Sequence, residues 1–544
     1  MNPGDRRTFA LEALLLLALA AGVRLIGISQ DPLGHELYHV LAALGFLQDG
    51  SFTVGNGGIY DRTPGFTLLV ASLFRLFGES LELARIPALV AGSLIPVVVF
   101  AWLRAAGART AAWIAALLCA LHPWAISLSV QVRFYTIQGV LFLGSCIALF
   151  YASRRNTAAK RRLLLLVGGA LLFFGATRMQ IISIAGVPGL ILFLTLDHWE
   201  GLVDTLRSLI DEHPLAMGTV AMALIVGAAV LAGPMVDWLV TRGSTADLWA
   251  QQDVGNYRFY HWRLELAYPT IWTLFPFVVL GALAVRPRIA LLATCVFATS
   301  LTFHSVVAQK AVRYVEYVMP FFFVLTGLAA SKVPALVGSA ARRWARSPDT
   351  SWWPFSTKNT AGLVVAVGVA FAAVGNDGVM RTVRYLGAEH RYRTPTMSEG
   401  HMSWNLAADT LRSLADDREV VVSSSDTKAL YYLGTLDYVA KRNTLWVTGE
   451  GLAPEFSEDP RTGIPRISAP ESFGRLIRCH PSGLVIIQDN MMGVPAFVTA
   501  DAQQFIEENM DRIELPERYG LQVFEWDNAA SSQNIDECAS VGAE

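Results

Sequence analysis

The sequence predicts a polytopic α-helical membrane protein with about 11 transmembrane helices, followed by a soluble external α/β domain. Of the 544 residues, 53% are hydrophobic and 16% are charged, and the mean hydropathy is +0.41. This balance excludes an ordinary soluble enzyme. The formal net charge of -2 provides no basic field, so we expect no nucleic-acid partner.

Apolar segments long enough to cross a bilayer recur along the chain. The expected spans are 8–27, 84–103, 110–128, 135–153, 162–177, 180–196, 215–236, 265–285, 289–307, 314–331 and 360–376. Because their number is odd, the two termini lie on opposite sides of the membrane. Lys and Arg concentrate in the loops that share a side with the N-terminus, and this excess marks the cytoplasmic side.

Residues 28–83 are expected to form one large external loop, which is too long for a simple connector. The apolar segment 64–77 is short and contains Arg75, so we expect it to form a helix in the outer interface rather than a span. Segment 36–48 is expected to form a second helix of this kind. The loop is therefore a candidate for carrying functional residues.

The composition changes after residue 377, where the last expected span has ended. Residues 378–544 contain no long apolar run, and the runs at 419–425 and 483–488 are typical of buried strands. Segment 500–512 is typical of an amphipathic helix. We therefore divide the chain into a membrane domain, residues 1–377, and an external α/β domain, residues 378–544.

Polar residues gather at the outer ends of the expected spans. The set contains His35, Glu36, Tyr38, Asp61, Arg62, Arg133, Tyr135, Arg178, Gln180, His261, Lys310, Arg313 and Tyr314. Cations should be depleted on this side of the membrane, so their coincidence indicates a phosphate-bearing lipid as ligand. Any single cation among these residues could instead extend to the phosphates of ordinary membrane lipids at the interface. Glu36 could instead stabilise the N-terminus of the helix 36–48 through the helix dipole.

Several motifs follow one another in a characteristic order. They are His35-Glu36-Leu37-Tyr38, Asp61-Arg62-Thr63-Pro64, LFGESLELARIPALVAG (76–92), HPWAISLSVQVRFYT (122–136), GATRMQ (175–180), FYHWRLELAYPTIWTLFPFVVLG (259–281) and QKAVRYVEYVMPFFFVL (309–325). Their order resembles the GT-C glycosyltransferases, especially family 39 relatives such as the lipid A aminoarabinose transferase and the protein O-mannosyltransferases. In that family an Asp-Glu pair opens the first external loop. Here His35 stands in the first position, so the essential carboxylate is expected at Glu36, with Asp31 as a substitute.

The resemblance implies inverting transfer of a sugar from a polyprenyl-phosphate donor to a lipid, glycan or protein acceptor at the periplasmic face of the bacterial inner membrane. It makes Glu36 and Asp61 the expected catalytic residues. The donor phosphate would be bound by Arg62, Arg133, Arg178, Lys310 and Arg313. The other substrate contacts would come from His35, Tyr38, Tyr135, Gln180 and Tyr314. The resemblance further implies a divalent metal ion shared by Asp61 and His261.

A transporter or flippase for a lipid-linked substrate is the main competing function, although such proteins place polar sites near the bilayer midplane. An O-antigen ligase or polymerase is a second competing function, and a purely structural membrane protein is a third. Cys119, Cys146 and Cys295 lie in apolar runs and are expected to pack as small hydrophobes. A disulfide between Cys479 and Cys538 is a hypothesis for an oxidising compartment.

Overall fold

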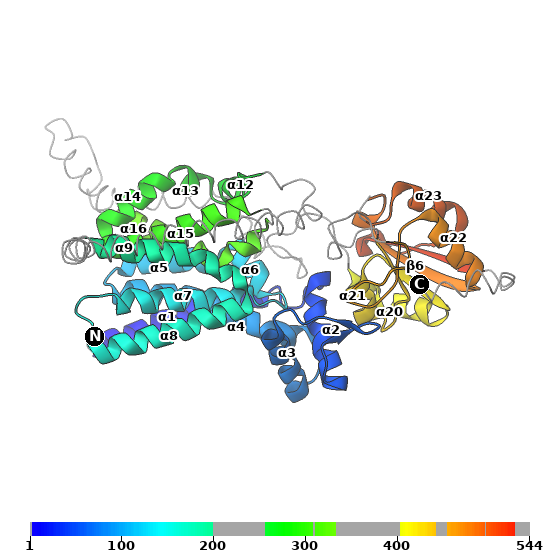
Figure 1. Ribbon diagram of the computed structural model, residues 1–544, viewed down its shortest axis with the longest axis horizontal. Coiled ribbons are helices and arrows are strands. Elements are labelled where there is room, and N and C mark those ends of the chain that lie inside the picture. The colour runs from blue at the N-terminus through cyan, green and yellow to red at the C-terminus, as the bar shows by residue number, and fades with distance from the viewer. Residues whose placement is uncertain are drawn as a thin grey trace, which may run out of the picture.

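The computed structural model describes residues 3–199, 256–307, 310–332, 403–441, 454–494 and 497–527. The membrane domain is entirely helical apart from one short hairpin within these residues. Its longer helices are α1 (Pro3–Leu25), α4 (Leu81–Ala105), α7 (Tyr135–Ala152), α8 (Ala159–Met179) and α15 (Pro287–Val306). They lie side by side in a bundle at one end of the molecule (Figure 1).

Within the described residues, five helices are long and apolar enough to cross a membrane, and a sixth crossing follows if the bent pair α5 (Arg109–Ala120) and α6 (Pro123–Ser129) is one span. Shorter helices occupy the other expected spans that the structure describes. They are η1 (Ile181–Gly186), α9 (Val187–Asp197), α12 (Phe259–Ala267), α13 (Pro269–Thr273), α14 (Phe275–Val285), η3 (Glu316–Val318) and α16 (Met319–Ala330). The expected spans 215–236 and 360–376 lie outside the described residues.

Four expected spans are therefore divided into shorter helices. Helices resume with a proline in their first turn at Pro123, Pro188, Pro269 and Pro320. Proline has no N–H to donate and disfavours helical backbone in the residue before it. His122 and Tyr268 accordingly leave the helical conformation, and the helix breaks there. Val187 and Met319 keep helical backbone, so the chain passes there from a 3-10 turn into an α-helix without a break. The α5–α6 axis bends by 56° at this kind of break.

Small residues allow close helix packing inside the bundle. A Cβ atom at Gly327 of α16 would lie 2.6 Å from the carbonyl oxygen of Ala111 in α5. A Cβ atom at Gly189 of α9 would lie 2.5 Å from Oγ1 of Thr299 in α15. Helices in lipid associate through such van der Waals contact because lipid supplies no hydrophobic drive between them.

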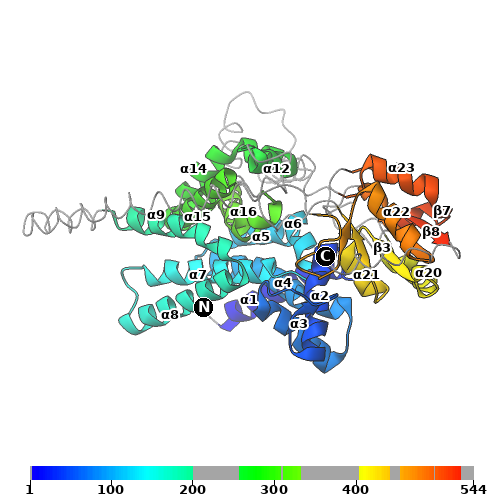
Figure 2. The same ribbon diagram turned by 45° about the vertical axis from the view of Figure 1, so that its right-hand side comes forward.

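The first external loop folds into two packed helices, α2 (Gly34–Asp49) and α3 (Pro64–Phe77), joined by a hairpin of β1 (Thr53–Val54) and β2 (Gly58–Ile59). The two helices expected at 36–48 and 64–77 are thus present. Their shared core includes Leu37, Val40, Phe66 and Val70, all fully buried. Both views place these helices between the bundle and the C-terminal domain (Figures 1 and 2).

The C-terminal domain is a mixed six-stranded sheet in the order β5-β4-β3-β6-β8-β7. Its strands are β3 (Val420–Ser423), β4 (Tyr438–Ala440), β5 (Arg466–Ile467), β6 (Ser482–Gln488), β7 (Asp511–Ile513) and β8 (Leu521–Asp527). Its helices are α20 (Trp404–Asp416), α21 (Asp426–Tyr432), α22 (Pro470–Cys479) and α23 (Ala500–Asn509). The strand runs expected at 419–425 and 483–488 correspond to β3 and β6. The expected helix 500–512 corresponds to α23 only as far as Asn509, because Asp511–Ile513 forms β7.

Both faces of this sheet are covered by helices. Val422 and Ile487 belong to the core that α22 and α23 share, whereas Val421 and Ile486 belong to the core that α20 and α21 share. Successive strand residues point to opposite faces, so a strand buried on both sides reads as an uninterrupted apolar run. Cys479 is disulfide-bonded, and its expected partner lies outside the described residues.

Candidate functional site

Glu36 in the first turn of α2 is completely buried against Arg85 of α4. One carboxylate oxygen lies 3.1 Å from Nη2 and 3.2 Å from Nε of Arg85 and accepts the Val132 N–H at 3.0 Å. The other oxygen accepts the Leu33 N–H at 2.9 Å. Arg85 also donates to the carbonyl oxygen of Ile28 at 2.7 Å.

In this arrangement Glu36, the expected catalytic carboxylate, is enclosed by its hydrogen-bond partners. A side chain with both oxygens engaged and no exposed surface cannot receive a proton from a substrate in this structure. Glu36 instead ties α2 to α4 and to the turn between α6 and α7.

Asp31, the expected substitute for Glu36, is also engaged. Its carboxylate lies 2.9 Å from Nζ of Lys428 and accepts the Tyr432 hydroxyl at 3.1 Å. It also accepts the Asn405 N–H at 3.1 Å. Asp31 therefore attaches the C-terminal domain to the start of the first loop.

His35 stands at the centre of an arginine cluster that comes from four parts of the chain. Burial lowers the pKa of His35 well below its usual range, and the charges of Arg133, Arg313, Arg461 and Arg62 lower it further. His35 is half-buried, and no hydrogen bond to its side chain occurs within the described part of the chain. Four guanidinium groups that act on one imidazole define a strongly positive site.

Arg133 and Arg313 have hydrogen-bonding capacity left over. Arg133 is 5% exposed, and its Nη1 lies 3.4 Å from the hydroxyl oxygen of Tyr60. Within the described ranges, the buried Nε of Arg133 and of Arg313 has no hydrogen-bond acceptor. The guanidinium carbons lie 5.9 Å from the Tyr135 ring and 5.2 Å from the Tyr314 ring, respectively. Buried donors of this kind are suited to an anionic ligand.

Tyr38 and His39 line the same face of α2. The Tyr38 ring stacks on Tyr60 at 5.0 Å, and its hydroxyl donates to Asp426 at 2.9 Å. His39 is fully buried, and its Nδ1 lies 2.9 Å from Oγ1 of Thr67. Its Nε2 has no hydrogen-bond partner among the residues that the structure describes. Burial lowers the pKa of His39 well below its usual range, so this ring is neutral at pH 7.

The backbone is strained immediately after Arg62. Thr63 adopts φ +54°, a left-handed conformation that is costly for a β-branched residue, and it precedes the first turn of α3. The Thr63 hydroxyl donates to the carbonyl oxygen of Met179 at 3.1 Å. This contact places the Arg62 segment against the outer end of α8.

The remaining expected site residues are placed differently. Arg178 is exposed at the end of α8, and Asp61 is exposed at the end of the loop. Lys310 donates from Nζ to the carbonyl oxygen of Val307 at 2.8 Å. Gln180 is half-buried before η1.

The structure does not bring Asp61 and His261 into a shared ligand set. The Trp272 indole N–H donates to Nδ1 of His261 at 2.6 Å, and Nε2 lies 3.5 Å from Glu265. Among the described residues, no three His, Cys, Asp or Glu side chains are grouped as metal ligands. These residues do not fit a divalent ion at this position, so no chemical step is routed through a metal.

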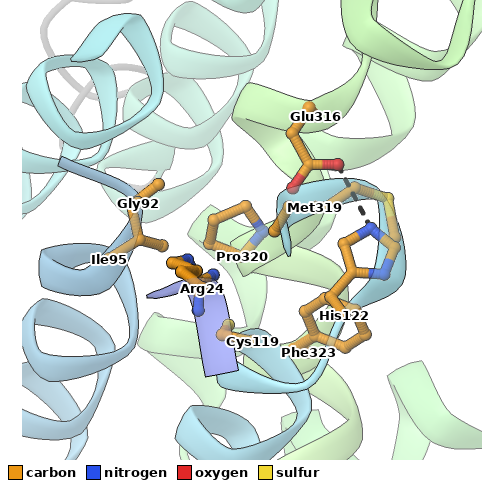
Figure 3. A pocket seen from close by; sticks show the side chains of 10 residues that line it. Arg24, Gly92, Ile95, Cys119, His122, Glu316, Met319, Pro320 and Phe323 are labelled. Carbon is orange, nitrogen blue, oxygen red and sulfur yellow. Dashed lines mark hydrogen bonds and ion pairs between the residues drawn. The ribbon is translucent and has the colours of Figure 1, made fainter. Parts of the chain in front are cut away.

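A second polar cluster lies inside the bundle, at the break between α5 and α6 (Figure 3). His122 Nε2 lies 3.1 Å from a carboxylate oxygen of Glu316, and His122 Nδ1 lies 2.5 Å from the Tyr268 hydroxyl. Arg24 donates to the Ala120 carbonyl at 3.1 Å and to Ser129 Oγ at 3.0 Å. The Ala120 carbonyl is one of those that the end of α5 leaves without a helical partner, so Arg24 caps the break.

Sequence patterns alone did not identify Arg461, Arg85 or the cluster around His122. Arg461 lies in a polar loop of the C-terminal domain and carries no local motif. His122 stands within an apolar stretch, where only the neighbouring Pro123 signals a break. These residues become functional candidates only through contacts with distant segments.

Residues 61–232 match the family model described as dolichyl-phosphate-mannose-protein mannosyltransferase. A search of curated protein sequences finds no match.

Two solved structures of ArnT from Cupriavidus metallidurans are similar over nearly the whole chain. The apo structure has 14% identity and a TM-score of 0.55, with 96% of this chain and 98% of that chain covered. The structure bound to undecaprenyl phosphate has 16% identity and a TM-score of 0.53, with 98% and 100% covered. The oligosaccharyltransferase of Archaeoglobus fulgidus tethered with an acceptor peptide has 12% identity, a TM-score of 0.51 and coverage of 96% and 74%. The expected resemblance to the GT-C superfamily is confirmed.

Proposed function

We propose that the protein is an inverting glycosyltransferase that moves a sugar from a polyprenyl-phosphate donor to a cell-envelope acceptor. The observation that carries this proposal is the convergence of Arg62, Arg133, Arg313 and Arg461 on His35. The unused donors of Arg133 and Arg313 support an anionic ligand at this point. The shared fold and the match to a mannosyltransferase model support sugar transfer as the reaction class.

In this proposal an acceptor oxygen attacks C1 of the sugar while the bond between C1 and the phosphate oxygen breaks. The electron pair of that bond leaves with the polyprenyl phosphate. The arginine cluster stabilises the charge that develops on the leaving phosphate, because preorganised cations act strongly where water is excluded. Attack from the face opposite the phosphate inverts the anomeric carbon.

The acceptor proton needs a base, and His35 is the candidate that the geometry favours. It is neutral, half-buried and central to the arginine cluster, while Glu36 and Asp31 are engaged elsewhere. A bound phosphate would offset the surrounding positive charge and so raise the proton affinity of His35 as catalysis begins. Asp61, which is exposed at the loop end, is the second candidate for this role.

We place the reaction at the periplasmic face of a bacterial inner membrane. The N-terminus of α1 lies at the end of the bundle away from the C-terminal domain (Figure 1). Arg104 lies in the last turn of α4, and Arg154 and Arg286 follow the ends of α7 and α14. All three helices run toward that same end of the bundle. The arginine cluster and the C-terminal domain would therefore share the external side.

The test is transfer of labelled sugar from a panel of polyprenyl-phosphate sugars by the full chain in lipid nanodiscs. His35→Ala is expected to lower the rate by about 10²- to 10⁴-fold, and added imidazole is expected to restore part of it. His198→Ala, at the opposite end of the bundle, is the matched control and should retain the wild-type rate. Loss without imidazole rescue would exclude His35 as the base and leave Asp61.

A lipid-linked substrate transporter is the competing function. The same nanodiscs distinguish it, because a transporter moves the labelled lipid between leaflets and leaves the sugar-phosphate bond intact. Absence of transfer from every donor, with acceptors supplied by membrane extract, would overturn the transferase proposal.

A further inference from the structure

The C-terminal domain lies next to the first external loop (Figure 2), and hydrogen bonds and an ion pair join the two. Asp31 pairs with Lys428 at 2.9 Å, and the two side chains are 12% and 5% exposed. The Thr427 hydroxyl donates to the Gly34 carbonyl at 2.8 Å, one residue before His35. These contacts hold the C-terminal domain over the start of α2.

A further attachment involves the loop that carries Arg461. The Asn56 N–H donates to the Thr462 carbonyl at 2.7 Å. A Cβ atom at Gly58 would lie 2.3 Å from the carbonyl carbon of Arg461, so the hairpin can approach this loop only because residue 58 is glycine. Gly463 adopts φ +66°, and a Cβ atom there would lie 2.4 Å from the Asn56 carbonyl oxygen.

Asp459 shapes the same loop from within. Its carboxylate accepts the Arg461 N–H at 2.9 Å, and its carbonyl accepts the Gly463 N–H at 2.7 Å. The loop is therefore a tight turn held by its own hydrogen bonds and by the hairpin. Arg461 leaves this turn toward the membrane domain, where its guanidinium carbon lies 5.1 Å from the ring of Tyr38.

The geometry points to a phosphate-binding site that is completed across the two domains, with Arg461 as the C-terminal domain's contribution beside Arg133. Arg461 lies over the Tyr38 ring, Tyr38 stacks on Tyr60, and the Tyr60 hydroxyl lies 3.4 Å from Nη1 of Arg133. Arg461 is placed there by the Gly58 contact and by the Asp459 turn. Its ligand is a phosphate group of a lipid-linked substrate. The identity of that substrate as a polyprenyl-phosphate sugar rests on the proposed function.

Guanidinium suits this role because it presents several N–H donors in a plane and stays charged. A docked domain that supplies one cation would also couple substrate binding to its own docking, since the phosphate would bridge Arg461 and the membrane-domain arginines. Binding of the substrate should consequently stabilise the docked arrangement.

The experiment measures binding of polyprenyl phosphate and of inorganic phosphate to the full chain in nanodiscs. Arg461→Gln is expected to weaken polyprenyl-phosphate binding by at least about tenfold, which corresponds to about 1.4 kcal/mol. Arg461→Lys should lose less because it keeps the charge. Arg512→Gln removes an exposed arginine of the same domain and should bind as the wild type does.

The unfolding temperature of each variant without ligand reports whether the domain remains docked and folded. An unchanged unfolding temperature with weakened binding supports the inference. Wild-type affinity for both probes in Arg461→Gln would overturn it. Inorganic phosphate could bind in an Arg461-dependent manner while polyprenyl phosphate does not bind the wild type. That result would support the phosphate site and contradict the proposed function.

Discussion

Replacing Glu36 by Gln tests whether this residue is a base or a structural anchor. The substitution removes the negative charge beside Arg85, whose side chain has no exposed surface. An amide also offers one oxygen where the structure uses two, so either the Leu33 or the Val132 N–H loses its acceptor. Breaking a buried ion pair in this way costs about 3–5 kcal/mol.

We expect Glu36→Gln to lower the unfolding midpoint in mixed micelles of mild detergent and SDS, and to lose activity together with stability. A double-mutant cycle with Arg85→Met gives the coupling directly. The double variant Glu36→Leu/Arg85→Met should be more stable than Glu36→Gln, because it leaves no buried charge without a partner. Both measurements are made on the full chain, with polyprenyl-phosphate binding as the readout of an intact site.

A catalytic base would behave differently. Glu36→Gln would then unfold at the wild-type midpoint and bind polyprenyl phosphate normally, while transfer fell by about 10²-fold or more. That result would refute the structural role and support Glu36 as the catalytic base.

Three further predictions follow from the described contacts. Gly92→Ala should destabilise the bundle by about 1–3 kcal/mol, because the new Cβ would lie 2.0 Å from Ser129 Oγ. The unfolding midpoint measures this effect, and a midpoint equal to that of the wild type would contradict the contact. Because the folded-state pKa values of His35 and His39 lie well below the usual one, the unfolded chain takes up protons below about pH 6.5 that the folded chain does not. Stability should therefore fall as the pH is lowered from 7 to 5, by up to about 1.4 kcal/mol per histidine and pH unit, and a variant with glutamine at both positions should show a shallower fall. Arg178→Gln removes an exposed cation and should change the transfer rate by less than about threefold, whereas a loss of about 100-fold would return it to the phosphate site.

Local sequence patterns were sufficient to predict the membrane character, the positions of most helices and three of the four arginines around His35. The length of an apolar segment determines whether it can cross a bilayer, and the distribution of Lys and Arg determines the orientation. Both properties belong to the local sequence and do not depend on tertiary contacts. Arg62, Arg133 and Arg313 were found because cations at the outer ends of spans need an explanation. The strands β3 and β6 were found because burial on both faces leaves an uninterrupted apolar run.

The partners of the charged groups depended on the tertiary structure. Glu36 and His35 are adjacent in sequence, yet one is sealed against Arg85 while the other faces four arginines. Arg461 comes from a separate domain more than 400 residues away in the chain. The burial and the electrostatic environment of a side chain depend on how the whole chain packs. A local sequence pattern does not indicate which distant side chain will contact a given residue. The sequence by itself therefore determined which residues were available for the chemistry, and the folded arrangement decided which of them lie together in the site.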